Sequence, residues 1–383
     1  MTFRPYFFSA LAVLVLLSQP VSALETKARA AYVLDYNTGT VLLEKNADEQ
    51  IPPASMSKLM TINMVFEALE DGRLTLDEKL PVSEHAMSYG GSTMFLNTRD
   101  RVRVGDLIQG VIVLSGNDAC AVLAEALAGS EREFARLMTE RAKQLGMTQS
   151  HFVNSNGWPD PGQRMSAHDL GILAAHLIRV FPQYYHYFSE TEFRFDNRAP
   201  DNRHNRNPIL KMGIGADGLK TGHTQEAGYG MVGSAVKNGR RIIAVVSGLS
   251  SDEERGSEAA KLINWGFRQF SEKKILTEGQ KVGKLNVWMG QQKSVNLVVP
   301  KDVNALLPVA TEGKLSGEIK LREPLQAPIK KGQVVGTLVL TVPDMKDIEV
   351  PVVAEKAVEK GGLLSRFKLS ASLLLQNVMA AVN

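Results

Sequence analysis

A hydroxyl and an amine lie three positions apart at Ser55 and Lys58, where apolar spacing predicts the start of a helix. Side chains at this separation are neighbours on one face of a helix. A lysine loses its proton when it is desolvated or lies near another cation, and a neutral amine can activate a serine as a nucleophile. The same Ser-x-x-Lys pattern starts at Ser234, Ser271 and Ser365, so the pattern alone does not identify an active site.

Two further motifs could complete such a site. Ser115-Gly116-Asn117 follows Ser55 by 60 residues, in an expected loop between helices. Ser-x-Asn recurs at Ser294, and a serine that caps a helix is the ordinary alternative. Lys220-Thr221-Gly222 begins 105 residues beyond Ser115, just before an expected strand, and occurs once. A lysine, a hydroxyl and an unobstructed glycine on a strand edge can hold a carboxylate and let a peptide lie alongside.

Both strands and helices must position these motifs. Period-two runs beside turn residues predict hairpins, and apolar residues at helical spacing predict helices. The β and α parts of one domain therefore lie on both sides of a helical insertion. In chain order we expect a hairpin (30–35 and 40–45), a helix (55–69), an insertion over 104–180 with helices at 120–127, 131–145 and 167–178, a second hairpin (229–236 and 240–249) and a helix (252–270).

The last third of the chain changes character twice. Short Val, Leu and Ile runs between 275 and 353, broken by Gly and Pro, predict a small all-β domain. From Gly361 to Asn383, apolar residues at i, i+3 and i+4 steps predict an amphipathic helix. This helix is too short after Lys368 to span a bilayer, but it could lie in a membrane interface. A helix that docks on its own protein is the alternative.

Composition excludes several classes of protein. With 383 residues, 44% hydrophobic and 22% charged, the chain is too long for one ordinary core and too apolar to be disordered. Two or three domains are expected. A net charge of +3 is too small to suggest a nucleic-acid surface.

The first 23 residues are typical of a secretory signal peptide. Arg4 precedes an apolar run over 7–17, and Val21-Ser22-Ala23 supplies a small-residue cleavage pattern. The run is shorter than the roughly 20 apolar residues that a spanning helix needs. The single cysteine, Cys120, excludes an intramolecular disulfide and a cysteine-based metal site, and we expect it to be a small buried hydrophobe. The histidines form no HExxH-type pair, so no zinc site is expected.

Taken together, the three motifs resemble those of the penicilloyl serine transferases, and most closely the low-molecular-mass penicillin-binding proteins that are D-alanyl-D-alanine carboxypeptidases. The resemblance extends to the residues around each motif (53–60, 115–120, 217–224 and 227–229), and to the signal peptide, β domain and tail. It implies an α/β transpeptidase-like domain with an antiparallel sheet and a helical insertion, followed by a small all-β domain and a C-terminal amphipathic helix. The expected boundaries are 1–23, 24–272, 273–355 and 356–383.

The resemblance also implies catalytic roles. Ser55 is the expected acylated nucleophile and Lys58 its general base, although the route of the proton is disputed within the superfamily. Ser115 would connect Lys58 to the leaving amine, and Asn117 would hold the substrate's amide.

Substrate-binding roles follow in the same way. Lys220 and Thr221, beside Gly222, would bind the terminal carboxylate, and Lys220 would help to keep Lys58 neutral by repulsion. The backbone N–H groups of Ser55 and His223 would form the oxyanion hole, which favours a backbone role for His223 over acid–base chemistry. Arg206 resembles an arginine near this site in relatives, with a structural role as the equal alternative.

The implied function is a serine-type carboxypeptidase that removes the terminal D-alanine from peptidoglycan stem pentapeptides in cell-wall maturation, is inhibited by β-lactams and needs no cofactor or metal. We expect it on the periplasmic side of the inner membrane, anchored peripherally by its tail. A D-alanyl endopeptidase is the first alternative. A class A β-lactamase is less favoured, because residues 154–169 contain no Glu to act as a second base. A non-catalytic wall-binding protein would be expected to have lost Ser55, Lys58 or Lys220, and all three are present.

Overall fold

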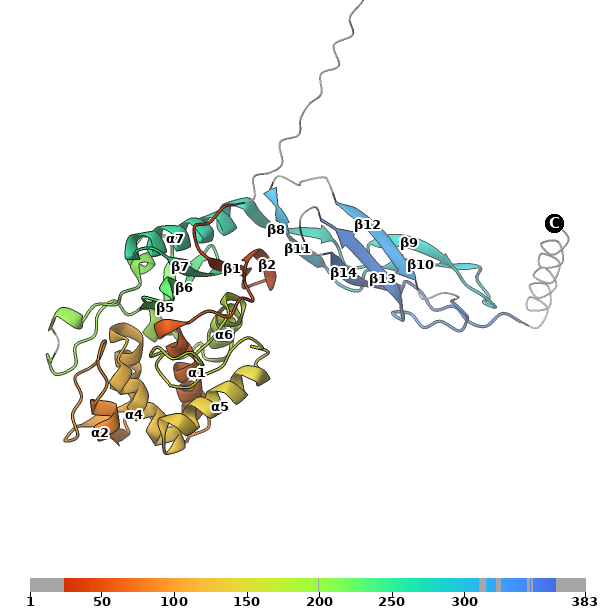
Figure 1. Ribbon diagram of the computed structural model, residues 1–383. Helices are drawn as coiled ribbons and strands as arrows, with labels where there is room; N and C mark the ends of the chain where they lie inside the picture. Colours follow the sequence, from red (N-terminus) through yellow and green to blue (C-terminus); the bar gives the residue numbers. More distant parts are fainter. Residues whose placement is uncertain are drawn as a thin grey trace, which may run out of the picture.

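The structure is a computed structural model that describes residues 24–198, 200–309, 315–321, 325–342, 345 and 347–362. The expected signal peptide and the tail from residue 363 lie outside the described residues. Within them, a mixed α/β part is followed by an elongated β part, and the chain leaves the far end of the β part at Gly362 (Figure 1).

The α/β part is built on a five-stranded antiparallel sheet in the order β2-β1-β7-β6-β5. The turn between β6 and β7 has positive φ at Asn238 and Gly239, as the hairpin prediction requires. Because β1 pairs with β7, the hairpin at the start of the chain forms one side of the sheet, with β2 at that edge. β5 lies at the opposite edge. The strands are β1 (Ala30–Asp35), β2 (Thr40–Lys45), β5 (Ala216–Thr224), β6 (Gly228–Lys237) and β7 (Arg240–Leu249).

Helices cover both faces of this sheet (Figure 1). On one face, α7 packs through Leu262 and Ile263 against inward residues of β6 and β7. On the other face a larger core holds α1, whose Leu59, Met60 and Phe66 are fully buried, together with most of the insertion. The helices here are α1 (Lys58–Glu70), α2 (Glu84–Met87), α3 (Val104–Gln109), α4 (Asn117–Ala128), α5 (Glu131–Gln144), α6 (Ala167–Val180) and α7 (Asp252–Gln269).

The expected helices and hairpins of this part are present, with small shifts at their ends. The N-termini of α5, α6 and α7 are fixed by Ser130, Ser166 and Ser251, whose side chains accept a backbone N–H three residues on. Short elements that the sequence did not indicate complete it: the pair β3 (Lys79–Pro81) and β4 (Arg101–Arg103), a π-helix η2 (Gly110–Leu114) and 3₁₀ turns η1 (Ala54–Ser57), η3 (Tyr185–Ser189), η4 (Pro200–Asn202) and η5 (Pro208–Lys211).

The β part has its own core and its own sheet, in the order β12-β13-β14-β10-β9, with a separate pair β11-β8. Its main cluster contains no residue of the α/β part, which confirms the predicted small all-β domain. The strands are β8 (Phe270–Leu276), β9 (Lys281–Asn286), β10 (Ser294–Val298), β11 (Val303–Pro308), β12 (Ser316–Leu321), β13 (Val334–Thr341) and β14 (Ile348–Ala354).

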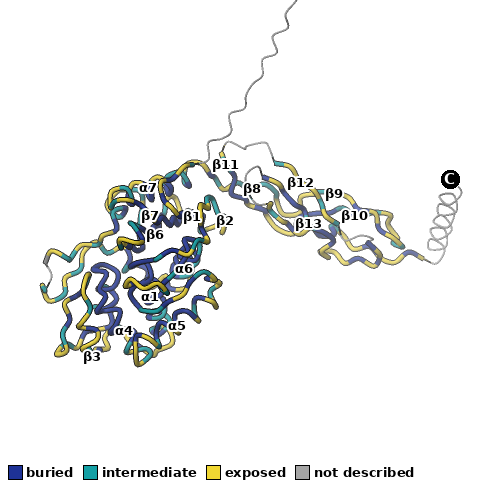
Figure 2. The backbone as a smooth tube through the Cα atoms, in the orientation of Figure 1, coloured by how far each residue is buried: buried dark blue, intermediate teal, exposed yellow. Residues whose placement is uncertain are grey.

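Residues 355–362 still belong to this β part. Val358 bridges to Ile329 and Lys360 bridges to Gly290, both antiparallel. The first residues of the predicted 356–383 helix are therefore not helical, because they pair along the β domain instead. Buried positions are concentrated in two separate regions of the backbone, one for each part (Figure 2).

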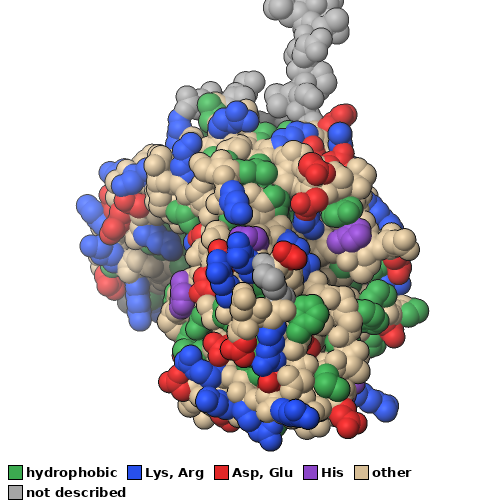
Figure 3. Space-filling model, turned by 90° about the vertical axis from the view of Figure 1, so that its left-hand side faces the viewer, with side chains coloured by type: hydrophobic (Ala, Val, Ile, Leu, Met, Phe, Trp, Pro, Cys, Tyr) green, Lys and Arg blue, Asp and Glu red, His purple; other side chains and the backbone are tan. Residues whose placement is uncertain are grey.

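Surface charge fits the small net charge of the sequence. On the face shown in Figure 3, Lys and Arg side chains are interspersed with Asp and Glu rather than gathered in one patch. No helix of the described residues is long and apolar enough to cross a bilayer.

Candidate active site

Ser55 lies on the 3₁₀ turn η1, just before α1, rather than on the α-helix that the spacing predicted. Ala54 takes a positive φ of 48°, which turns the chain sharply into η1. Ser57 fixes the turn: its hydroxyl donates to the carbonyl of Ala54 at 3.0 Å and accepts from the side-chain amide of Gln163 at 3.0 Å. The backbone turn that carries the Ser55 side chain is therefore held in place.

Lys58 is fully buried directly behind Ser55. Its Nζ lies 3.1 Å from Ser55 Oγ, 2.7 Å from Asn117 Oδ1 and 2.6 Å from the backbone oxygen of Asn156. The amide and the carbonyl oxygens can only accept. A neutral amine has two N–H groups for these two acceptors and one lone pair, and the hydroxyl of Ser55 is the only one of the three partners that can donate to it. The arrangement suits a general base for Ser55.

The environment favours the neutral form of this amine. Burial is the main effect that lowers the pKa of Lys58, to about 8, and the positive charge of Arg206 also lowers it, although Cys120 and Asp118 oppose the shift. A base with a pKa near the working pH combines a useful neutral fraction with a strong tendency to take a proton.

The second motif enters the site between η2 and α4. Ser115 has a left-handed backbone with φ of 61°, and its buried Oγ has no hydrogen-bond partner. Asn117 is held at both ends: its Oδ1 accepts from Lys58, and its Nδ2 donates to the carbonyl of Gly90 at 2.9 Å. The structure thus brings Asn117 to Lys58, whereas Ser115 Oγ makes no hydrogen bond to the amine.

The third motif lies on β5, at the edge of the sheet. Lys220 and Thr221 are buried, and Lys220 Nζ donates to the Thr221 carbonyl at 3.2 Å. A Cβ on Gly222 would come within 2.9 Å of the Pro53 carbonyl and 3.2 Å of Ala54 Cβ, so β5 packs directly against the turn that carries Ser55. Only glycine fits this contact. His223 is exposed, and its ring stacks on Tyr229 at 3.9 Å between centroids.

Positive charge surrounds Lys220. Burial is the main cause that lowers its pKa well below the ordinary lysine value, and Lys58, Arg206 and Arg255 lower it further by repulsion. An anion that enters would relieve this repulsion, so the site is suited to a carboxylate. Arg206 reaches the site from the segment before β5: its guanidinium donates to Ser92 Oγ at 2.9 Å and to the carbonyl of Leu114, next to Ser115.

Three contributors were not predicted from the sequence. Asn156 supplies a backbone oxygen, which no side-chain pattern can reveal. Gly157 has φ of 81°, and a Cβ there would lie 1.9 Å from the Ala54 carbonyl, so this glycine lets its loop close over η1. Arg255 is 4% exposed, donates to the Gly222 carbonyl at 3.4 Å and lies over the Tyr229 ring. Arg255 occupies an ordinary position in the helical pattern of α7, so nothing in the sequence indicated that it belongs to the site.

The described residues offer little support for a metal ion, a cysteine nucleophile or a carboxylate base at this site. These residues contain no group of three or more His, Cys, Asp or Glu side chains placed to hold a metal ion. Cys120 is buried on α4, and burial raises its pKa to about 12, so it is an inert core thiol, as expected. Glu131, the buried carboxylate behind Asn156, accepts hydrogen bonds from Ser155 and Tyr89 and is not free to act as a base.

Comparisons with known proteins agree on one family. A family model described as "D-alanyl-D-alanine carboxypeptidase" matches residues 17–251, and one described as "Penicillin-binding protein 5, C-terminal domain" matches residues 270–360. The chain is 38% identical to D-alanyl-D-alanine carboxypeptidase DacC of Escherichia coli, over 95% of this chain and 90% of the relative. It is 35% identical to DacF of Bacillus subtilis, over 91% and 90%.

Solved structures give the same result. The D-alanyl-D-alanine carboxypeptidase DacD from Francisella tularensis superposes with a TM-score of 0.76 at 32% identity, covering 88% of this chain and 95% of that one. Penicillin-binding protein D2 from Listeria monocytogenes in its ampicillin-bound form superposes with a TM-score of 0.58 at 32% identity, covering 64% of this chain and all of that one.

Proposed function

The chain belongs to the D-alanyl-D-alanine carboxypeptidase family and is a serine-type enzyme of that activity, and we propose that Ser55 and Lys58 carry its chemistry. The observation that supports these roles most strongly is the set of three partners around the Lys58 amine, of which Ser55 is the only possible donor. We take the substrate to be the stem pentapeptide of peptidoglycan, with β-lactams as inhibitors.

The first half of the reaction forms an acyl-enzyme. Ser55 Oγ attacks the carbonyl carbon of the penultimate D-alanine while its proton passes to Lys58 Nζ. The oxygen of that carbonyl becomes an oxyanion, which the backbone N–H groups of Ser55 and His223 would stabilise. The C–N bond then breaks, and the leaving D-alanine takes the proton from Lys58. Ser115 is suited to relay this proton, because its buried hydroxyl has no other partner.

The second half returns the enzyme to its starting state. Water attacks the ester at Ser55 while Lys58 accepts a proton from it. The bond between the acyl carbon and Ser55 Oγ then breaks as Lys58 returns the proton to that oxygen, and the shortened peptide leaves with a new carboxylate. During the first half, Lys220 and Thr221 would hold the carboxylate of the leaving D-alanine, with Arg206 and Arg255 adding positive charge. Asn117 would orient the substrate's amide once substrate competes for its side chain.

The loop after α5 argues against efficient β-lactamase activity. Residues 154–169 lack a Glu, and the backbone carbonyl of Asn156, rather than a carboxylate, meets Lys58 there. With no second base, the penicilloyl ester should persist. An endopeptidase would use the same nucleophile. The two activities are therefore distinguished by which substrate the enzyme cleaves faster, a pentapeptide or a cross-linked dimer.

Release of D-alanine tests this function directly. Wild type should release it from a pentapeptide, and Ser55→Ala should lower kcat by at least about a thousandfold, because the nucleophile is lost. Ser271→Ala is a matched control, since Ser271 begins another Ser-x-x-Lys pattern on β8 and should keep full activity. Faster cleavage of cross-linked dimers than of pentapeptide would favour the endopeptidase, and full activity of Ser55→Ala would refute the assignment.

Export and attachment to the periplasmic face of the inner membrane are part of the same proposal. The support for attachment is that the described chain ends where the β part is farthest from the α/β part, so an amphipathic tail there would hold the active site away from the membrane (Figure 1). Trp288 is 40% exposed at this end, in the loop that pairs with Lys360, as is typical of residues at a lipid interface.

A further inference from the structure

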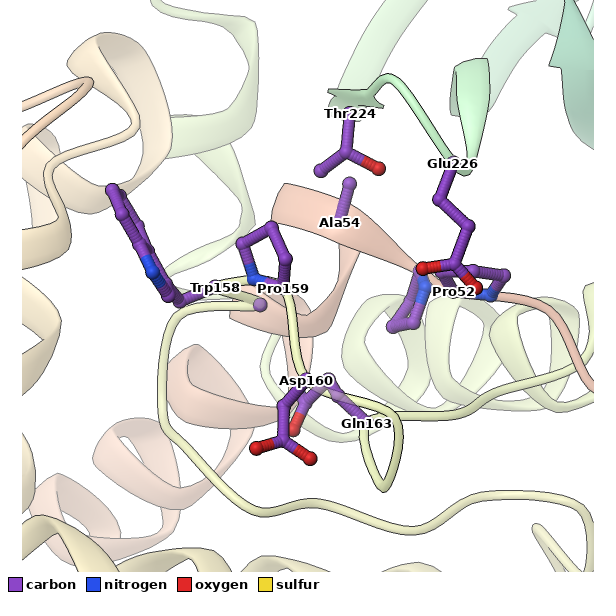
Figure 4. A pocket seen from close by; sticks show the side chains of 10 residues that line it. Pro52, Ala54, Trp158, Pro159, Asp160, Gln163, Thr224 and Glu226 are labelled. Carbon is purple, nitrogen blue, oxygen red and sulfur yellow. The ribbon is translucent and has the colours of Figure 1, made fainter.

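Of the three partners of Lys58 named above, the Asn156 carbonyl alone is a backbone atom, so its position depends on what holds its loop. The loop runs on through Trp158 and Pro159 beside Ala54 (Figure 4). In the proposed reaction, the two acceptors of Lys58 take its N–H groups and leave its lone pair for the nucleophile. A displaced Asn156 carbonyl would let the amine turn away.

One oxygen of Glu131 holds this loop. Glu131 is the first residue of α5 and is only 8% exposed. Its Oε1 accepts from the Ser155 N–H at 2.9 Å, from the Ser155 hydroxyl and, at 3.4 Å, from the side-chain amide of Asn156. The Ser155 carbonyl in turn accepts from the Thr61 hydroxyl on α1. The segment that carries the Asn156 carbonyl is therefore bonded to both α5 and α1.

The other oxygen of Glu131 is bonded to α2 and the residues that follow it. Oε2 accepts from the Tyr89 hydroxyl at 2.7 Å and lies 2.7 Å from His85 Nε2. Burial raises the pKa of Glu131, but the hydrogen bonds from Ser155, Tyr89 and His85 outweigh it and hold the pKa below its ordinary value. Glu131 is therefore a buried, charged carboxylate with both oxygens engaged.

The charge of Glu131 also acts on the amine. Burial is the largest influence on the pKa of Lys58 and lowers it, whereas the negative charge of Glu131 raises it. The other titratable groups that face this amine come from other elements: Asp118 and Cys120 on α4, Lys220 on β5, and Arg206 from the segment before β5. A substitution at Glu131 leaves all of these groups in place.

We propose that Glu131 is a positioning residue, which holds the Asn156 carbonyl against Lys58 and so directs the lone pair of the amine to Ser55. The inference rests on the proposed roles of Ser55 and Lys58. Glu131 touches neither the reacting atoms nor the substrate, and it acts through the segment 155–156. Loss of its bonds should therefore change the rate of acylation, and loss of its charge should change the pH dependence.

Glu131→Gln tests the proposal with little change in size. A glutamine has one acceptor oxygen, and its NH₂ group must face either Ser155 or the side of Tyr89 and His85, so some of the bonds are lost. The rate constant for acylation by benzylpenicillin, measured per acylated site, should fall at least about tenfold on its high-pH plateau. The midpoint of the pH profile should move down by at least about half a pH unit, because the amine loses a nearby negative charge.

Glu258→Gln is the matched control. Glu258 lies on α7, is 6% exposed, and accepts from the Thr26 hydroxyl at 2.7 Å and from the Lys27 N–H at 3.2 Å. This variant should lose stability in urea but keep the wild-type plateau and midpoint. A wild-type plateau in Glu131→Gln, or a lower plateau with an unmoved midpoint, would overturn the proposal, since a merely structural role leaves the pKa of Lys58 unchanged.

Ser155→Ala decides the matter if Glu131→Gln does not fold. It removes one bond to Glu131 and keeps the charge, so kcat for D-alanine release, measured per acylated site, should fall about two- to five-fold. An unchanged kcat would overturn the positioning role. Absence of a penicilloyl adduct on Ser55 in wild type would instead overturn the proposed roles of Ser55 and Lys58, and the inference with them.

Discussion

At the scale of single residues, the chemistry depends on an amine that is neutral at ordinary pH. The motif predicted which hydroxyl and which amine would meet, since their spacing places them on one helical face. It could not predict the third partner, because the Asn156 carbonyl belongs to the backbone of a distant loop. Nor could it predict Arg255, which reaches β5 only because α7 packs on the same sheet.

The pKa of Lys58 gives a prediction about pH. The base must be neutral to accept the proton of Ser55, and its pKa lies at about 8. The second-order rate constant for acylation by penicillin should therefore rise about tenfold per pH unit well below 8 and level off above it. Stopped-flow or quench measurements between pH 5 and 10 can follow this. A rate that keeps rising to pH 10, as for an unperturbed lysine, would contradict the assignment, and Lys58→Gln should lower the plateau by about 10²–10⁴-fold.

At the scale of elements, the site forms where η1 meets β5, the junction of η2 and α4, and the loop that contains Asn156 and Gly157. The sequence predicted α1, β6 and β7 well, because their periodicity records burial, but it placed Lys220 just before a strand, whereas Lys220 lies on β5. It missed the 3₁₀ turn and the π-helix, because both are set by tertiary contacts. The Ser57–Gln163 bond fixes the turn, and the left-handed Ser115 ends the π-helix.

Gly157 tests how tightly the elements meet. Gly157→Ala combines a strained φ of 81° with a Cβ that would lie 1.9 Å from the Ala54 carbonyl. Gly129 is a matched control, because its φ of 74° is similar and a Cβ there would meet nothing within 4 Å. Gly129→Ala should cost about 1–2 kcal/mol of unfolding free energy from backbone strain alone and leave acylation unchanged.

Gly157→Ala should cost more than this control and slow acylation by penicillin at least about tenfold, because the turn that carries Ser55 must shift. Urea unfolding and the acylation rate are measured on the same samples. Equal losses of stability in the two variants, with normal acylation in both, would show that the contact between Gly157 and Ala54 does not position the nucleophile.

At the scale of the whole molecule, the α/β part and the β domain have separate cores, and the core of the α/β part lies on both faces of its sheet. The shift to short Gly- and Pro-broken runs predicted the second core correctly. Its exact end was harder to predict, because residues 355–362 make isolated bridges that leave no alternating pattern.

A chain that ends at Gly362 tests what the tail does. It should release D-alanine from pentapeptide within about twofold of the full mature chain, because no described residue beyond β7 and α7 contributes to the site. In fractionated cells it should move from the membrane pellet to the soluble periplasmic fraction. Retention in the membrane would show that the β domain or another surface holds the enzyme there.

All of the proposed chemistry depends on acylation of Ser55, activated by Lys58. Peptide mass spectrometry after brief incubation with benzylpenicillin tests it most directly. We expect one penicilloyl adduct, on the peptide that contains Ser55, and none in Ser55→Ala. An adduct on Ser115, Lys220 or any other residue in wild type would contradict it.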